Sequence, residues 1–149
     1  METLVFLGVC LVVALTVPSA ETKKFSQCEL AQVLKKSGID GFVSTKVADW
    51  VCLAKYESSY DTKAINDNGN SRDYGIFQIN SKHWHDDGRT PDAKNACHID
   101  CRKLLNDNIE DDLKCAKQIA EEAKGLTPWI GWKNHCQGKK VDKYVKGCF

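Results

Sequence analysis

The sequence lacks an apolar run long enough to cross a membrane, and its charges nearly cancel. An uncharged run covers residues 4–17, whereas a membrane-spanning helix needs about 20 apolar residues. The 149 residues carry 21 basic and 20 acidic side chains, a balance that gives no reason to expect a nucleic-acid partner. The chain has three prolines, no internal repeat and no low-complexity tract, so nothing in it resembles an interdomain linker. One domain is the expectation for this length.

The uncharged run at 4–17 has the character of a secretory signal. Residues 18–20, Pro-Ser-Ala, follow it as small or turn-forming residues, although Glu2 stands where Lys or Arg is usual. We expect residues 1–20 to be a signal peptide, with a boundary as late as residue 22; an uncleaved anchor is the alternative, which the short run disfavours. Residues 23–149 would form the secreted domain, free of the membrane after cleavage. Losing two acids with the signal leaves 21 basic and 18 acidic residues, a net charge of +3.

Cysteine is plentiful in this chain, which indicates a disulfide framework formed in an oxidising compartment. Of the eight cysteines, Cys10 lies in the signal segment. Seven remain: Cys28, Cys52, Cys97, Cys101, Cys115, Cys136 and Cys148. Because seven is odd, at least one thiol is unpaired within the chain or pairs outside it.

Three segments show helical periodicity. The first helix is expected to start at Ser26, where Glu29 completes a capping box, and to end at Gly38. Its apolar stripe would consist of Leu30, Val33 and Leu34. Two more helices are expected over about 47–57 and 109–124.

Between the second and third helices the sequence changes to turn and strand signals. Residues 66–71, Asn-Asp-Asn-Gly-Asn-Ser, are a dense turn signal. They separate residues 63–65 from the β-prone run 73–80, so a small antiparallel sheet is expected. Short helical pieces are expected near Trp132 and Val141. Helices beside one small sheet make the expected fold class α+β.

Two carboxyl groups, those of Glu57 and Asp73, stand in unlike surroundings. Glu57 closes an apolar helical run, and burial disfavours the charged form of a carboxyl, so we expect it to hold its proton. Asp73 opens a strand-like run among polar residues and should stay ionised. One acid and one carboxylate across a cleft can cleave a glycosidic bond. The plainer alternative is an exposed helix-end acid and a turn residue.

With these residues the chain resembles the c-type lysozyme and α-lactalbumin family over residues 23–149. The matching stretches are residues 24–30 (KFSQCEL), 50–52 (WVC), 56–58 (YES), 73–81 (DYGIFQINS), Cys97 with Cys101, 115–117 (CAK), 129–132 (WIGW) and 147–148 (GC). Lysozymes hydrolyse the β-1,4 bond between N-acetylmuramic acid and N-acetylglucosamine in bacterial cell walls. α-Lactalbumins bind a galactosyltransferase and generally lack the catalytic pair.

Because both carboxyl groups are present, the resemblance implies a muramidase that is secreted and monomeric. It would act on bacterial cell-wall polysaccharide with retention of anomeric configuration and with no cofactor for catalysis. The implied fold is lysozyme-like, with a helical lobe and a small sheet lobe on either side of a cleft. A non-enzymatic regulatory or glycan-binding protein of the α-lactalbumin kind is the alternative.

The resemblance also assigns roles within the cleft. Glu57 would be the general acid, with Trp129 as the apolar wall that raises its pKa. Asp73 would be the nucleophile or stabiliser, held by Asn80, Ser71 or an amide from the turn. The glycan contacts would be Gln78, Asn80, Trp84, Trp129 and Glu122, whereas Trp50 and Trp132 are expected in the core.

The family pairing of cysteines, carried over, gives Cys28–Cys148, Cys52–Cys136 and Cys97–Cys115. The fourth family bridge cannot form, because His85 stands where the partner of Cys101 would be. Cys101 would then be a free thiol, either buried and inert or paired with another chain. The absent bridge would have closed a loop of about seventeen residues, worth on the order of 3 kcal/mol by chain entropy. Convergence of His83, His85, His98 and Cys101 on zinc is another reading of this loop.

A calcium loop is implied as well. Residues 103–112 lack the glycine and terminal glutamate of an EF-hand but resemble the calcium loop of α-lactalbumins and some lysozymes. The ligands would be the carbonyl oxygens of Lys103 and Asn108 and the side chains of Asn106, Asp111 and Asp112. Asn106 stands where an aspartate is usual, and the loss of that charge should weaken binding. An acidic helix N-terminus without metal is the alternative.

Overall fold

The computed structural model describes residue 8 and residues 23–149, so the expected signal peptide otherwise lies outside the described residues. The helices are α1 (Gln27–Lys36), α2 (Val47–Ser58), α3 (Glu110–Ala123) and α4 (Ile130–His135), and the strands are β1 (Ile65–Asp67), β2 (Arg72–Tyr74) and β3 (Ile79–Asn80). The described residues also contain the short 3-10 helices η1 (Phe42–Ser44), η2 (Cys101–Leu104) and η3 (Val141–Tyr144). This arrangement confirms the expected α+β class.

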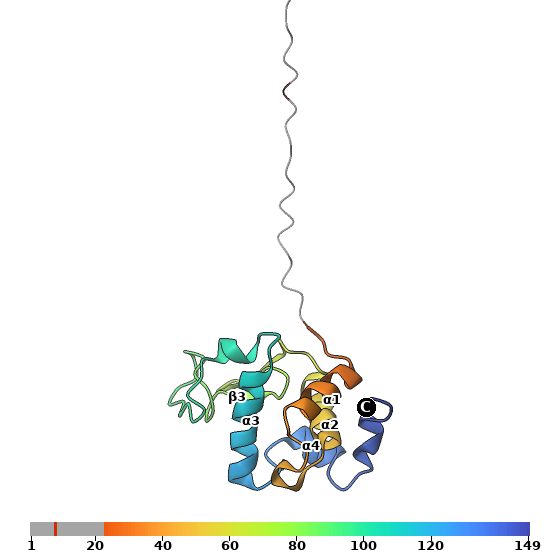
Figure 1. Ribbon diagram of the computed structural model, residues 1–149. Helices are drawn as coiled ribbons and strands as arrows, with labels where there is room; N and C mark the ends of the chain where they lie inside the picture. Colours follow the sequence, from red (N-terminus) through yellow and green to blue (C-terminus); the bar gives the residue numbers. More distant parts are fainter. Residues whose placement is uncertain (1–7, 9–22) are drawn as a thin grey trace, which may run out of the picture.

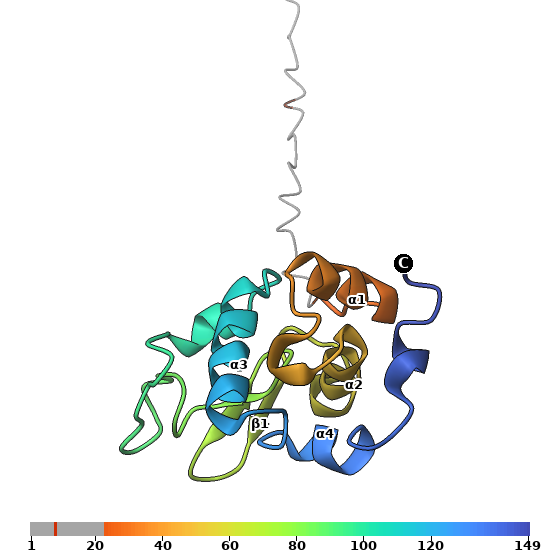
Figure 2. The same ribbon diagram turned by 60° about the horizontal axis from the view of Figure 1, so that its bottom comes forward.

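The helices and the sheet form two lobes. α1, α2 and α4 gather on one side, and α3 lies between them and the sheet-bearing segment (Figure 1). In the view turned by 60°, β1 is labelled below α3 and beside α4 (Figure 2). Within the described residues, none of the helices is long and apolar enough to span a membrane.

α1 begins with the predicted capping box. The Ser26 hydroxyl accepts the Glu29 N–H at 3.2 Å, and the Glu29 carboxylate accepts the Ser26 N–H at 3.0 Å. The predicted apolar stripe is wrong at one position, because Val33 is 38% exposed. The buried face consists of Leu30, Ala31 and Leu34. That face is centred one residue away from the predicted stripe, which places Val33 on the flank of the helix.

α2 is the centre of the core. Its residues Trp50, Val51, Cys52, Leu53 and Ala54 have no exposed surface, as expected for a helix that is apolar on all sides. Phe77 and Trp129 pack edge-on against the Trp50 ring, with centroid distances of 5.9 and 6.0 Å. The helix therefore reaches Glu57, near its C-terminal end, with its backbone already fixed by the core.

The expected small antiparallel sheet is present, and the β-prone run over residues 73–80 supplies two of its strands. Residue 73 pairs with residue 80 and residue 74 with residue 79, so the run folds back on itself as β2 and β3. The intervening Ile76 and Phe77 are both fully buried. Neighbours along a strand point to opposite faces, so a turn is needed to place both of them in the core. Gly75 and Gln78 take positive φ values of 79° and 49° to make this turn.

The three predicted disulfides, Cys28–Cys148, Cys52–Cys136 and Cys97–Cys115, are confirmed. Cys101 is a free, buried cysteine, as predicted. The zinc reading is wrong, because the described residues contain no group of three or more His, Cys, Asp or Glu side chains able to hold a metal ion.

His85 ties the loop where the fourth bridge is missing. Its side chain is fully buried, and Nε2 lies 2.7 Å from the Ile79 carbonyl oxygen. Because a carbonyl can only accept, Nε2 carries the proton. Burial lowers the pKa of His85 below its ordinary value and so favours this neutral ring. The ring also packs edge-on against Tyr74 at 4.8 Å.

Replacing His85 with cysteine should restore the missing bridge. The Asp86 N–H donates to the Ile99 carbonyl and the Cys101 N–H to the Asp86 carbonyl, both at 3.0 Å, so the two positions lie on neighbouring segments. We expect His85→Cys to raise the free energy of unfolding by up to about 3 kcal/mol, less the lost His85 packing. Urea unfolding with and without reductant measures the gain. His85→Ala is the control and should be destabilised; a thiol at Cys101 that still titrates in folded His85→Cys would contradict the prediction.

Candidate active site

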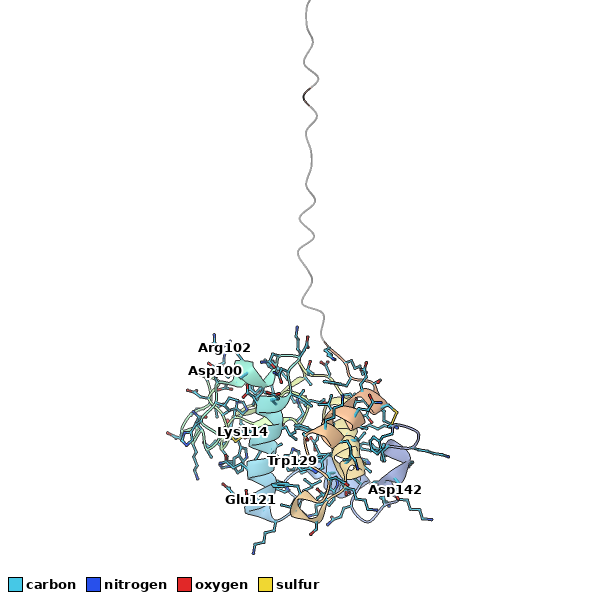
Figure 3. All side chains as sticks on the ribbon, viewed as in Figure 1. Asp100, Arg102, Lys114, Glu121, Trp129 and Asp142 are labelled. Carbon is cyan, nitrogen blue, oxygen red and sulfur yellow. A yellow bond between two sulfur atoms is a disulfide. The ribbon has the colours of Figure 1, made fainter. Side chains whose placement is uncertain are left out.

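One cavity of about 390 Å³ brings most of the predicted site residues together. Helix α2 contributes Glu57 and the β2–β3 hairpin contributes Asp73. The remaining lining residues are Asn68, Gln78, Ile79, Asn80, Trp84, Ile119, Pro128, Trp129 and Ile130. Figure 3 marks Trp129 between α3 and the helices on the other side. The cavity thus lies where the helical lobe meets the sheet lobe.

Glu57 is half-buried at the helical wall of the cavity. Its Oε1 accepts the Gly131 backbone N–H at 2.9 Å. Burial raises the pKa of the Glu57 carboxyl, the Gly131 N–H opposes that rise, and the negative charge of Asp73 adds to it. The net direction is upward, so this carboxyl keeps its proton to higher pH than an exposed glutamate does.

Trp129 is held rigidly in the same wall. Its indole Nε1 donates to the Phe77 carbonyl at 2.8 Å, and 5% of the side chain is exposed. Phe77 lies in the hairpin turn, so this bond joins the helical wall to the sheet wall. Trp50 is fully buried in the core as predicted, and the Trp132 indole lies 3.4 Å from Asp49 Oδ1.

Asp73 is oriented by two amide donors. Asn80 Nδ2 donates to Oδ1 and Asn68 Nδ2 donates to Oδ2, each at 2.8 Å. Asn80 Nδ2 also reaches the Ser71 hydroxyl at 2.9 Å. The hairpin creates this arrangement, because it pairs residue 73 directly with residue 80. The sequence indicated three possible hydrogen-bond donors to Asp73: Asn80, Ser71 and an amide of the turn. In the structure Asn80 and the turn residue Asn68 donate to the carboxylate, and Ser71 accepts from Asn80 instead.

Four of the five residues expected to contact the glycan line the cavity, and the fifth does not. Asn80, Trp84 and Trp129 line the cavity. Gln78 lines it too, but its amide nitrogen donates to the Ala64 and Gly75 carbonyls, both at 3.0 Å. Glu122 is exposed on α3 and is not among the residues that line the cavity.

Sequence reasoning missed an apolar part of the cavity wall and one backbone donor. Ile119 and Pro128 line the cavity, as does Ile130, which is 71% exposed. The Gly131 N–H is the missed donor. The first N–H groups of a helix have no partner within that helix, so a predicted helix start at residue 130 was the one signal that could have found it.

The loop predicted to bind calcium has a feature that fits a cation. Asp112 is 1% exposed, and its Oδ1 has no hydrogen-bond partner in the described part of the chain. Burial raises the pKa of Asp112 to about 8, and the charge of Asp111 adds to the rise. A buried carboxyl next to a second acid is costly unless a cation compensates it. The other donors would be one amide and two carbonyl oxygens, a set that suits calcium.

Asn106, the amide among the proposed calcium ligands, already forms a hydrogen bond within the loop. Asn106 Oδ1 accepts the Asn108 N–H at 3.1 Å, and Asn108 Oδ1 accepts the Glu110 N–H at 3.0 Å. These local bonds shape the segment that leads into α3. They also leave Asn106 with fewer free lone pairs, in addition to its lack of charge.

Comparison with known proteins agrees with this geometry. Lysozyme C-2 of Sus scrofa is 49% identical over 148 residues, which cover 99% of each chain. Lysozyme C-1 of Sus scrofa is 52% identical over 126 residues, which cover 85% of this chain and 98% of the relative. Lysozyme C of Trachypithecus obscurus is 50% identical over 150 residues, again 99% of each chain. A family model described as "C-type lysozyme/alpha-lactalbumin family" matches residues 23–148, and the chain therefore belongs to that family.

Proposed function

We propose that this protein is a muramidase, a glycosidase that cleaves the β-1,4 bonds of bacterial peptidoglycan. The observation that carries the proposal is the pair of carboxyl groups in one cavity, Glu57 half-buried with a raised pKa and Asp73 held by two amides. The nearly full-length similarity to lysozymes C supports the same reaction. An α-lactalbumin-like regulatory role is less well supported, because that branch generally lacks this pair.

The two carboxyl groups divide the chemistry, a division of which lysozymes are the standard example. Glu57 donates its proton to the glycosidic oxygen as the bond from that oxygen to the anomeric carbon breaks. Asp73 attacks the anomeric carbon from the opposite face, or stabilises the positive charge that develops there. Glu57, now ionised, takes a proton from water, and the resulting hydroxide replaces Asp73 at the anomeric carbon. The second displacement restores the original configuration and both carboxyl groups.

The rest of the cavity would bind the glycan. Trp84 and Trp129 offer aromatic faces to sugar rings, and Asn80 offers an amide. Gln78 would contribute its carbonyl oxygen, since its nitrogen is engaged. Glu122 is exposed on α3. It would therefore contact only a part of the glycan that extends beyond the cavity.

Secretion as a monomer belongs to the same proposal. Secretion is supported by the apolar segment at residues 4–17 and by three disulfides, which form in oxidising compartments. Calcium would be a structural ion, held by Asp111 and Asp112, the Asn106 side chain and the carbonyls of Lys103 and Asn108. When bound, the ion would compensate the negative charge of the buried Asp112 carboxylate.

Replacing either carboxyl should abolish most of the clearing of a bacterial cell-wall suspension. We expect Glu57→Gln to lower the initial rate by at least about 100-fold, because general acid catalysis contributes on that order or more. Asp73→Asn should cause a comparable loss. Glu121→Gln, an exposed acid on α3 outside the cavity, is the control and should match wild type. Equal rates for wild type and Glu57→Gln would exclude the proposed reaction.

Activity should fall on the alkaline side of its pH profile at a pH above the ordinary pKa of a glutamate. Glu57 must be protonated to act, so activity is lost as pH rises through its raised pKa. The charge of Asp73 contributes to that rise. In Asp73→Asn the Glu57 pKa should therefore fall, which ¹³C NMR titration of the Glu57 carboxyl can measure without any activity. An unchanged or higher Glu57 pKa in Asp73→Asn would contradict this account.

Calcium should stabilise the folded protein. We expect the Tm to rise on adding millimolar calcium and to fall again with excess chelator, because an ion that binds only the folded state stabilises it. Asp112→Asn should lose the response, while Asp107→Asn, in the same loop but outside the proposed ligand set, should retain it. Identical melting temperatures of the wild type in calcium and in chelator would rule out the ion.

A further inference from the structure

The ring of His85 is satisfied at one nitrogen only. Its side chain is fully buried, whereas the other three histidines of the chain are exposed. Nε2 donates to the Ile79 carbonyl oxygen at 2.7 Å. Nδ1, on the other side of the ring, is buried and has no hydrogen-bond partner among the described residues. A neutral ring tolerates this arrangement, because its unprotonated Nδ1 carries a lone pair and no hydrogen.

A second proton on this ring would have no acceptor. It would bind to Nδ1, because Nε2 already carries a proton, and it would place a donor and a full charge in a buried position. A buried donor without a partner costs free energy, and a buried charge costs more. In the unfolded chain the ring takes up the proton at its ordinary pKa of about 6.5. Burial lowers the pKa of the folded His85, so acid favours states in which the ring is exposed.

Three carboxylates lie close enough to attract a charged ring, those of Asp73, Asp86 and Asp87. Each of them is bonded elsewhere. Asp73 accepts two side-chain amides, and Asp86 Oδ1 accepts a backbone N–H of its own loop at 2.8 Å. Asp87 accepts two backbone N–H groups at 2.9 and 2.8 Å and the Tyr74 hydroxyl at 3.1 Å. Their attraction therefore acts without a hydrogen bond to the ring, and burial outweighs it.

The other elements around the ring supply no acceptor for Nδ1 either. β2 presents the Tyr74 ring, edge-on at 4.8 Å, and the Tyr74 hydroxyl interacts with the Cys101 thiol of η2. Beside Cys101, Asp100 and Arg102 form an ion pair with each other at 2.8 Å. Lys103 of η2 is exposed, and β3 contains no charged residue.

The position of His85 connects it to the sheet side of the active site. Ile79, whose carbonyl it holds, lines the cavity, and so does Trp84, the residue before it in the chain. Ile79 is followed by Asn80, whose amide donates to Asp73 at 2.8 Å. Release of the His85 ring would therefore loosen two parts of the cavity wall together, the amide that holds the proposed nucleophile and the proposed sugar platform at Trp84.

We propose that His85 is a positioning residue for the sheet side of the active site and an acid-sensitive latch. Its neutral ring holds β3 to the loop that follows it, and a proton taken up from solvent at Nδ1 releases this tie. The stabilisation by the neutral ring is complete above a pH of about 6.5 and is lost as the pH falls through the lower pKa of the folded state. The positioning role rests on the proposed muramidase function, whereas the latch itself does not.

Hydrogen exchange of the amides that flank His85 tests the latch in wild type and in His85→Gln. The glutamine amide can donate to the Ile79 carbonyl in place of Nε2 but takes up no proton. The reporters are the Asp86 and Cys101 N–H groups, which donate across the loop at 3.0 Å. From about pH 7 to about pH 4.5, their protection in wild type should fall relative to His85→Gln by up to about tenfold per pH unit, the effect of one proton. The Leu53 amide of α2 is the internal reference and should show a smaller difference.

The acid side of the clearing profile should follow the latch. With each profile normalised to its own maximum, His85→Gln should keep its activity to lower pH than wild type, because acid releases the cavity wall only in wild type. The alkaline side depends on Glu57 and should be the same in both proteins. His98→Asn, at an exposed histidine of the same loop, is the control and should match wild type in exchange and in clearing. Asparagine tolerates the φ of 52° at residue 98.

An identical pH dependence of exchange protection in wild type and His85→Gln would overturn the latch, because His85 would then act by packing alone. Clearing profiles that coincide on the acid side would overturn the positioning role. If His85→Gln does not fold, ¹⁵N NMR of the wild-type ring decides. The ring should keep its proton on Nε2 alone until the Asp86 amide loses protection, and a second proton taken up at the ordinary pKa with that amide still protected overturns the latch.

Exchange and ring titration need no activity. Failure of the wild type to clear cell walls would therefore remove the proposed function and the positioning role, and the latch would still be decided by these two measurements.

Discussion

Burial of α2 is the constraint on which the rest of the molecule depends. The middle of this helix has no contact with solvent, and the Trp50 ring receives Phe77 from the hairpin turn and Trp129 from the start of α4. Both walls of the cavity are thereby packed on the same helix. Glu57 follows the buried stretch along the helix, and it is half-buried because its backbone has no freedom to carry it into water. The raised pKa of the carboxyl is a consequence of this packing.

The sheet side obeys a second constraint, which is close approach of backbone. A side chain at Gly75 would collide with the Leu104 carbonyl and with Asp112 Oδ2. The turn between β2 and β3 therefore lies directly against the loop proposed to hold calcium, two residues from Asp73. Where the fourth disulfide is missing, the neutral ring of His85 holds β3 by one hydrogen bond. A hydrogen bond constrains the unfolded chain far less than a disulfide does. The sheet lobe is therefore stabilised less by His85 than it would be by the fourth disulfide.

Two glycines thus mark the active site for different reasons. Gly75 combines a positive φ with backbone contact, whereas Gly131 has an ordinary helical φ and contacts the carboxyl of Glu57. At Gly75 the positive φ by itself favours glycine.

The sequence by itself determined the helices, the capping box at Ser26 and the resemblance that pairs the cysteines, because periodicity and motif spacing are local properties of the chain. It also indicated Glu57 and Asp73 by their unlike neighbours. Only the tertiary structure decided that residues 73–80 fold back as a hairpin, that Asn68 joins Asn80 on Asp73, and that Gly131 donates to Glu57. The last bond joins residues 74 positions apart. Contacts of that kind follow from how helices and turns pack around α2, which no local pattern in the sequence encodes.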